Sequence, residues 1–263
     1  MQSVTIGPCT LINADCRDVL PLASKVDAAV FSPPYNCGKD YGESGDEMGR
    51  DEYWNWMEDV VGRVAASIYM SGYLCINHGN YIGSRETRQY VPDELCPILS
   101  RQIPFVDHII WDKGPPSGAA WGNFRTAPRI RAQHENIWVH GGLGDMRPSD
   151  IEWSEWASFT ASIWRIPTTG VDASIHPAMM PIEVARRLVM LYSPAKGSVI
   201  DPFMGSGTTG IACIRSGRSF TGIEKDPGHF ETSVNRIRSA WHDWNSRLPI
   251  EAAATQTSFN FNN

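Results

Sequence analysis

Two prolines between a serine and a tyrosine form the part of this chain best suited to hold a small planar molecule. They make up the tetrapeptide Ser32-Pro33-Pro34-Tyr35. Neither proline has a backbone N–H, and the fixed proline φ keeps the turn extended. A hydroxyl, carbonyl oxygens with few local partners and an aromatic ring could together bind a flat group that carries an NH2. A Pro-Pro turn with a packing tyrosine is the alternative interpretation of the same residues.

A glycine-rich turn in the carboxyl-terminal part of the chain offers a second binding element. The segment Ser198–Phe203 is typical of a strand, Met204–Gly210 of a turn and Ile211–Arg215 of a helix, and the next strand, Ser219–Ile223, is followed by Glu224. Glycines let a ligand approach the backbone, and a helix N-terminus offers free N–H groups. A carboxylate at the end of the next strand can bind two ribose hydroxyls. This order predicts a nucleoside-cofactor site, although dinucleotide-binding folds share the glycine spacing.

The elements that must position these residues alternate along the chain. Strand patterns fall at Thr10–Asn13, Val26–Phe31, Gly72–Asn77, Val106–Trp111, Asn136–His140, Ser198–Phe203 and Ser219–Ile223. Helical patterns fall at Glu52–Tyr69, Asp93–Gln102, Pro181–Tyr192 and His229–Trp244. Such alternation predicts an α/β fold with a doubly wound, mostly parallel sheet, in which ligands bind beyond the carboxyl ends of the strands.

These features together resemble the amino-methyltransferases of DNA, which transfer a methyl group from S-adenosylmethionine to cytosine N4 or adenine N6. The resemblance also rests on His176–Pro181, Asn13–Cys16, Ile109–Lys113 and His134–Val139, and it spans roughly residues 4–244. The tetrapeptide precedes the glycine-rich turn, as in the permuted subgroup called beta. The resemblance implies a Rossmann-like methyltransferase fold with an inserted target-recognition region.

The resemblance also implies a role for individual residues. Ser32 and the Pro33 carbonyl would accept the two N–H groups of the target amine, Pro34 would stiffen the turn, and Tyr35 would stack on a flipped-out base. The implied S-adenosylmethionine-binding residues are Asp15, His176, Pro177, Asp201, Pro202, Phe203, Gly205, Ser206, Gly207, Thr208, Thr209 and Glu224. A serine before Pro-Pro leans in this family toward cytosine N4. Adenine N6 stays open, because a serine hydroxyl could accept from either amine.

The domain organisation follows from the same resemblance. We expect one methyltransferase domain over residues 1–248, with a catalytic half at 4–113, a target-recognition region at 114–175 and a cofactor-binding half at 176–248, followed by a flexible tail at 249–263. The expected DNA-binding residues are Lys113, Arg125, Arg129, Arg131 and Arg147. A solvated loop with an accidental basic cluster is the alternative. Gly141–Ser174 is expected to be irregular.

Composition narrows the class of protein. The net charge of −6 argues against indiscriminate nucleic-acid binding, but a local basic patch can still bind DNA. The six cysteines include no Cys-x-x-Cys pair, so a disulfide framework or a zinc site is not expected and a reducing cytoplasm fits. No apolar stretch is long enough to cross a bilayer.

The sequence also suggests binding partners and leaves alternative functions open. Double-stranded DNA as substrate, a homodimer and a cognate restriction endonuclease follow from the resemblance only. A nicotinamide-dependent dehydrogenase would use the glycine-rich turn but leaves Ser32–Tyr35 unexplained. A catalytically silent nucleic-acid-binding module would keep the basic cluster but has no need of a cofactor turn. An RNA substrate is a smaller alternative.

Overall fold

The computed structural model describes residues 1–36, 48–83, 88–115, 132–142, 150–168 and 179–246. Within these ranges the chain forms a nine-stranded sheet in the order β1-β2-β11-β10-β3-β4-β8-β7-β9. Its strands are β1 (Gln2–Ile6), β2 (Cys9–Asn13), β3 (Val26–Phe31), β4 (Ile68–His78), β7 (Phe105–Asp112), β8 (His134–Gly141), β9 (Ile163–Arg165), β10 (Ser198–Asp201) and β11 (Ser219–Glu224). Strands β5 (Tyr81–Ile82) and β6 (Gln89–Tyr90) form a separate pair.

The central strands β2, β11, β10, β3 and β4 run parallel to one another. Strand β1 joins β2 antiparallel at one edge, and β8 joins β4 antiparallel on the other side. Strand β7 is antiparallel to β8, and β9 is parallel to β7. The predicted mostly parallel sheet is confirmed, and so is each strand that the sequence pattern predicted.

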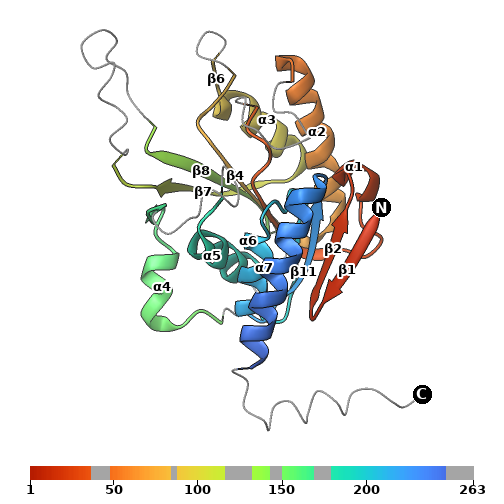
Figure 1. The fold of residues 1–263 in the computed structure, drawn as a ribbon. Helices are drawn as coiled ribbons and strands as arrows, with labels where there is room; N and C mark the ends of the chain where they lie inside the picture. Colours follow the sequence, from red (N-terminus) through yellow and green to blue (C-terminus); the bar gives the residue numbers. More distant parts are fainter. Residues whose placement is uncertain (37–47, 84–87, 116–131, 143–149, 169–178, 247–263) are drawn as a thin grey trace, which may run out of the picture.

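Helices cover both faces of the sheet (Figure 1). They are α1 (Cys16–Val19), α2 (Arg50–Ser67), α3 (Val91–Gln102), α4 (Trp153–Phe159), α5 (Ile182–Tyr192), α6 (Thr208–Arg215) and α7 (Pro227–Asn245). The interior strands are apolar on both sides, and alternate residues enter two cores. On β3, Ala28 and Val30 pack with α5, α6 and α7, whereas Ala29 and Phe31 pack with α2 and α3. The fold is therefore doubly wound, as predicted.

Helix α7 shows how local sequence sets an element. Asp226 lies at its N-cap, and the carboxylate accepts a hydrogen bond of 2.8 Å from the backbone N–H of His229. Such a cap satisfies a donor that the first turn would leave unpaired. Phe230, Val234 and Ile237 recur at three- and four-residue spacing and are buried against the sheet. These residues form the apolar face of the helix that was predicted at His229–Trp244.

The expectation that Gly141–Ser174 is irregular was wrong for the residues that the structure describes. Helix α4 and strand β9 lie in this segment, and β9 pairs with β7 at the sheet edge. Trp164 is fully buried in β9, and its indole N–H donates to the carbonyl of Phe159 at 3.1 Å. A strand of three residues is too short to show a period-two pattern, so tertiary packing decides it.

Other elements also differ from the sequence prediction. Strands β1, β5 and β6 and helix α1 had not been predicted. Helix α6 begins at Thr208 rather than Ile211, directly after Gly207, whose φ of 80° a glycine adopts without strain. The structure does not test the division at 114–175, but β9 within it belongs to the main sheet.

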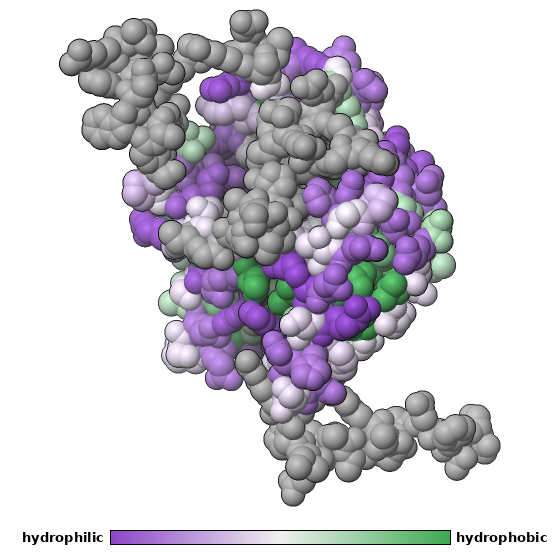
Figure 2. All heavy atoms as spheres, in the orientation of Figure 1, coloured by the Kyte–Doolittle hydropathy of each residue, from purple (hydrophilic) through white to green (hydrophobic). Residues whose placement is uncertain are grey.

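One face of the molecule is mainly polar where the structure describes it. On the face drawn in Figure 2, hydrophobic residues show only in small separate areas among hydrophilic ones. No helix among the described residues is long and apolar enough to cross a membrane. The five described cysteines are free thiols, and Cys37 lies outside the described residues.

Two glycine substitutions test how tightly the helices pack on the sheet. Gly62→Ala in α2 should raise the free energy of unfolding by up to about 1 kcal/mol, because alanine favours a helix; its Cβ would meet only the Gln102 side chain, at 3.8 Å. Gly210→Ala in α6 should instead lower it by about 1–3 kcal/mol. That Cβ would lie 2.7 Å from Ile237 Cδ1 and 2.9 Å from the Phe220 ring. Urea unfolding followed by circular dichroism measures both; equal effects would contradict the packing described.

Candidate active site

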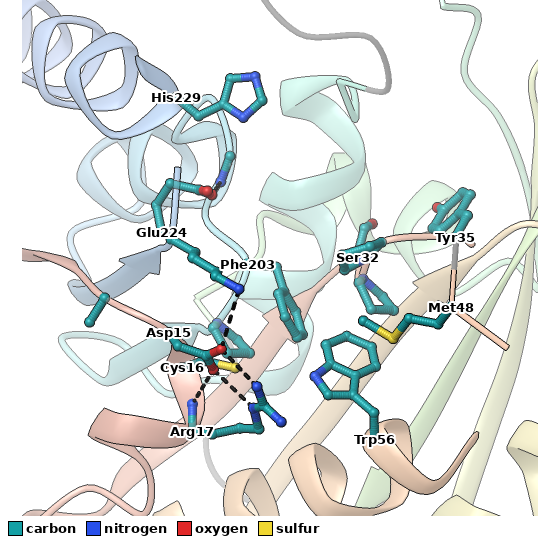
Figure 3. A pocket seen from close by; sticks show the side chains of 16 residues that line it. Asp15, Cys16, Arg17, Ser32, Tyr35, Met48, Trp56, Phe203, Glu224 and His229 are labelled. Atoms are coloured by element: carbon teal, nitrogen blue, oxygen red, sulfur yellow. Dashed lines mark hydrogen bonds and ion pairs between the residues drawn. The ribbon is translucent and has the colours of Figure 1, made fainter. Parts of the chain in front are cut away.

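The carboxyl ends of four neighbouring parallel strands, β2, β11, β10 and β3, meet at one edge of the sheet. An open cavity lies there, lined by residues that follow each of these four strands. In the view of Figure 3, Glu224, Asp15 and Arg17 lie on one side, Ser32 and Tyr35 on the other, and Phe203 between them. The two predicted binding elements, far apart in sequence, therefore share one cavity.

Most of the residues that the sequence singled out and the structure describes line this cavity. They are Ser32, Pro33, Pro34, Tyr35, Asp15, Pro202, Phe203, Gly205 and Glu224. The sequence reasoning did not identify the other lining residues, Ala14, Cys16, Arg17, Met48, Trp56, Lys225 and His229. Arg17, Lys225 and His229 follow the predicted strand ends closely, so proximity in sequence was an available signal. Trp56 comes from the middle of α2, where nothing local marks it.

The predicted residues Asp201, Ser206, Gly207, Thr208 and Thr209 are not among the lining residues; they build the turn that carries Phe203 and Gly205. The Asp201 carboxylate accepts hydrogen bonds from the backbone N–H of Phe203 at 2.9 Å and from Thr209 Oγ1 at 2.8 Å. Burial raises the pKa of Asp201 to about 7, although both hydrogen bonds favour the charged form. These residues act on the cavity through the shape of the turn.

Glu224, at the end of β11, ties the glycine-rich turn to the next helix. Its Oε2 accepts a hydrogen bond of 2.8 Å from the N–H of Gly205, and its Oε1 accepts one of 2.8 Å from the N–H of Asp226. Burial raises the pKa of the Glu224 carboxyl. Each oxygen keeps a lone pair for a ligand hydroxyl. The carboxylate is therefore held in a fixed position at the cavity wall.

Asp15, unlike Glu224, is paired with a cationic side chain. It is the N-cap of α1, and its carboxylate accepts from the backbone N–H of Arg17 at 3.0 Å and from the Arg17 guanidinium at 2.9 and 3.1 Å. The side-chain hydrogen bond from Arg17 is the main reason that the pKa of Asp15 is lowered. Lys225 Nζ lies 3.7 Å from the same carboxylate. A ligand at this end meets a carboxylate that is already paired with cations.

The tetrapeptide closes the opposite end of the cavity. Tyr53, from α2, donates its hydroxyl to the Pro34 carbonyl at 2.8 Å, which occupies one of the two proline carbonyl groups. The Tyr35 ring stacks on His78 with 4.3 Å between ring centroids, so one of its ring faces is already occupied. Ser32 Oγ accepts a hydrogen bond of 3.0 Å from Asn77 Nδ2. The Pro33 carbonyl receives no hydrogen bond from the described residues.

Several predicted residues lie outside the described residues, so the structure does not place them: His176 and Pro177 for the cofactor, and Arg125, Arg129, Arg131 and Arg147 for DNA. Lys113 is described, and it pairs with Glu135 at 2.9 Å between Nζ and Oε1. Its ammonium is only partly exposed. No group of His, Cys, Asp and Glu among the described residues could hold a metal ion.

The chemistry of the cavity suits a nucleoside joined to a charged, polar chain. Aromatic walls from Phe203 and Trp56 offer flat apolar surface, and the carboxylates of Asp15 and Glu224 offer hydrogen-bond acceptors. Gly205, whose φ is +50°, brings backbone rather than a side chain to the wall. These residues fit S-adenosylmethionine.

Comparison with known proteins decides the family. Residues 26–235 match the N6_N4_Mtase family, described as DNA methylase. The chain belongs to this family. It is therefore a DNA amino-methyltransferase of the N6/N4 class, and the dehydrogenase interpretation no longer applies.

Individual relatives cover most of the chain. The type II methyltransferase M.ScaI of Streptomyces caespitosus is 26% identical over 81% of this chain and 75% of its own length. The DNA adenine methyltransferase YhdJ of Escherichia coli K12 is 24% identical over 89% and 84%.

Two solved structures share the fold. A candidate DNA modification methylase from Thermus thermophilus, complexed with S-adenosyl-L-methionine, has a TM-score of 0.67 at 23% identity and covers 88% of this chain and 95% of its own. The cytosine-N4-specific PvuII DNA methyltransferase has a TM-score of 0.69 at 16% identity and covers 91% and 93%.

The raised pKa of Asp201 predicts how stability changes with pH. Unfolded aspartate titrates near pH 4, so this group stabilises the fold fully below that pH and loses its contribution as pH rises through about 7. Between pH 5 and pH 8 the free energy of unfolding should fall more in the wild type than in Asp201→Asn, by on the order of 2–3 kcal/mol. The amide does not titrate: its oxygen can accept from the Phe203 N–H, and the Thr209 hydroxyl can rotate and accept from its NH2. Urea unfolding at the two pH values measures this; equal slopes in both proteins would contradict it.

Proposed function

We propose that the chain transfers a methyl group from S-adenosyl-L-methionine to an exocyclic amino group of a flipped-out base in double-stranded DNA, with cytosine N4 favoured and adenine N6 as the alternative. The observation that carries this proposal is the shared cavity: Ser32 and Pro33 line the same space as Gly205 and Glu224. The Thermus relative with bound S-adenosyl-L-methionine supports the choice of cofactor.

At the amine end, the target nitrogen is a poor nucleophile because its lone pair is delocalised into the base. Ser32 Oγ and the Pro33 carbonyl are fixed acceptors for its two N–H groups, so a more pyramidal nitrogen meets dipoles that are already in place. When bound, S-adenosylmethionine supplies a methyl group on a sulfonium centre; a nitrogen–carbon bond forms, the carbon–sulfur bond breaks, and the nitrogen releases a proton. Tyr35, which lines the same cavity, would stack on the base. Correct placement alone contributes several kcal/mol.

At the cofactor end, Glu224 would accept from the ribose hydroxyls and Asp15 would lie near the adenine. Phe203 and Trp56 would enclose the nucleoside, and the N–H-rich turn after β10 would face its polar part. His176 and Pro177 remain candidates for the amino-acid end of the cofactor on the resemblance alone.

The target base is the finer part of the proposal. A neutral serine before Pro-Pro favours cytosine N4 within the family, and the PvuII enzyme of the same fold is cytosine-N4-specific. The Escherichia coli relative bears the name of an adenine methyltransferase. Physically, a hydroxyl and a carbonyl can accept from either amine.

Partners and location are proposed on the same basis. Residues 114–175 with Lys113, Arg125, Arg129, Arg131 and Arg147 would contact the DNA, and the enzyme would act in the cytoplasm as a homodimer. Relatives named type II methyltransferases support a cognate restriction endonuclease as a further partner.

Nucleoside analysis tests the function and the base together. The protein is incubated with S-adenosylmethionine and unmethylated genomic DNA, the DNA is digested to nucleosides, and the digest is examined by mass spectrometry. We expect N4-methylcytosine; N6-methyladenine would keep the class and correct the base. Neither product on DNA, with cofactor binding intact, would overturn the proposal, and a parallel RNA reaction would detect an RNA substrate. Ser32→Ala is the matched control, expected to lose about 10²–10³-fold in rate at unchanged cofactor affinity.

Glu224→Ala tests the cofactor end. The variant should bind S-adenosylmethionine at least about tenfold more weakly in isothermal titration, because it loses the proposed ribose contact, one charged hydrogen-bonding group. Its affinity for DNA, measured by fluorescence anisotropy, should change much less. Glu155→Ala is a suitable control, since Glu155 pairs with Arg186 away from the cavity. Equal cofactor affinity in Glu224→Ala and the wild type would show that the ribose assignment is wrong.

A further inference from the structure

A polar cluster lies directly behind the Ser-Pro-Pro-Tyr turn, and the proposed mechanism does not yet use it. Asn77 is the penultimate residue of β4, Glu135 is the second residue of β8, and Lys113 directly follows β7. Strand register brings them together: Ile76 pairs with Phe31, so Asn77 lies beside Ser32, and Asn77 pairs with Ile137, two residues from Glu135. Diagonal neighbours on one face of an antiparallel pair are within reach of long side chains.

The hydrogen bonds of this cluster converge on Asn77. Its Nδ2 lies 2.8 Å from Glu135 Oε2, 2.9 Å from the Tyr35 hydroxyl oxygen and 3.0 Å from Ser32 Oγ. Tyr35 donates its own proton to Glu135 Oε2 at 3.0 Å. The amino group of one amide is therefore aimed at three oxygens, two of which belong to the tetrapeptide.

The charge on Glu135 fixes the orientation of that amide. Burial disfavours a charged Glu135, but Lys113 at 2.9 Å and the hydrogen bonds from Asn77 and Tyr35 outweigh it and lower the pKa of this carboxyl. An ionised carboxylate accepts hydrogen bonds and donates none. If Asn77 were flipped, its carbonyl oxygen would face the carboxylate, so Nδ2 must point toward Glu135 and Ser32.

A packing role alone does not account for this arrangement. Asn77 is 1% exposed, and its Oδ1 has no hydrogen-bond partner among the described residues. An unsatisfied buried oxygen costs about 1–3 kcal/mol, which an apolar side chain at this position would avoid. Such groups in native structures call for a functional explanation.

The hydrogen bond from Asn77 fixes the orientation of the Ser32 hydroxyl. A serine hydroxyl has two acceptor lone pairs and can rotate freely about its carbon–oxygen bond. The Asn77 N–H occupies one lone pair and restricts that rotation, leaving the other as an acceptor at a defined position. Groups that hold a reacting side chain in place determine whether a site is preorganised.

We propose that Asn77 and Glu135 are positioning residues for methyl transfer: Asn77 orients the Ser32 hydroxyl toward the target amine, and Glu135, neutralised by Lys113, holds Asn77 and Tyr35. This inference rests on the proposed function of Ser32. It adds two residues that act through the tetrapeptide and need not touch the base, and it gives Lys113 a role inside the protein in addition to its proposed DNA contact.

Single-turnover rates of the full-length protein, with tritiated S-adenosylmethionine and unmethylated genomic DNA, test this role. Asn77→Leu keeps the approximate shape but removes the N–H, and Glu135→Gln removes the charge. Each should slow methyl transfer about 10- to 100-fold. The dissociation constants for S-adenosylmethionine and DNA should stay within about threefold of the wild type, since neither residue lies among those lining the cavity.

Asp150→Asn is the matched structural control. It removes the charge that pairs with the buried Arg218, which precedes the amino end of β11 at the opposite edge of the sheet. This variant should lose thermal stability and keep the wild-type single-turnover rate. If Asp150→Asn, at a similar loss of thermal stability, slowed methyl transfer as much as Asn77→Leu does, the rate loss would reflect stability alone and the inference would be overturned.

A double-mutant cycle separates positioning from general structural support. If Asn77 acts through Ser32, adding Asn77→Leu to Ser32→Ala should slow the reaction less than about threefold further. Multiplicative losses in the double variant, or a wild-type rate in Asn77→Leu, would overturn the inference and leave the proposed function intact. A wild-type protein that methylates neither DNA nor RNA would overturn both.

Discussion

The alignment of parallel strand ends is the constraint on which the rest of this structure depends. Strands β2, β11, β10 and β3 are hydrogen-bonded neighbours that run in one direction, so whatever follows each strand emerges at the same edge of the sheet. Residues near positions 15, 32, 203 and 224 therefore share one cavity although the chain separates them widely. Helices on both faces bury the strands and keep this edge in register.

Buried carboxylates then convert that edge into a fixed surface. Asp201 accepts hydrogen bonds within the glycine-rich turn, and Glu224 links that turn to the N-terminus of α7. Glu135 accepts hydrogen bonds from the polar groups next to Ser32. Each accepts at least two hydrogen bonds, which offset the cost of its burial. Their environments differ: burial raises the pKa of Asp201 and Glu224, whereas the nearby Lys113 lets Glu135 keep a lowered pKa despite burial. A buried carboxyl group thus favours its neutral form where no cation lies close and its charged form where a lysine pairs with it.

The sequence predicted what is encoded locally. The tetrapeptide, the glycine-rich turn and Glu224 each follow an apolar strand within a few residues. The alternation of such strand patterns with helical patterns predicted the doubly wound sheet that carries them. The sequence did not identify Asn77, Glu135 and Trp56 as residues near the site. Strand register and helix packing bring them there, and neither leaves a local pattern in a single sequence. Strand β9 escaped because three residues show no period, and its Trp164 is fixed by the core.

Under the proposed function, the two ends of the cavity differ in the charge of their lining groups. Net charges lie mainly at the cofactor end, where Asp15 is paired with Arg17 and Glu224 is held by backbone N–H groups. At the amine end the groups that line the cavity are neutral: a hydroxyl, carbonyls and an aromatic ring. Behind these groups, the Glu135 carboxylate is paired with Lys113 and accepts hydrogen bonds from Asn77 and Tyr35. A neutral acceptor suits an amine that is neutral before transfer and gains positive charge only as the bond forms. Charge complementarity therefore increases along the reaction without favouring a protonated, unreactive amine in the ground state.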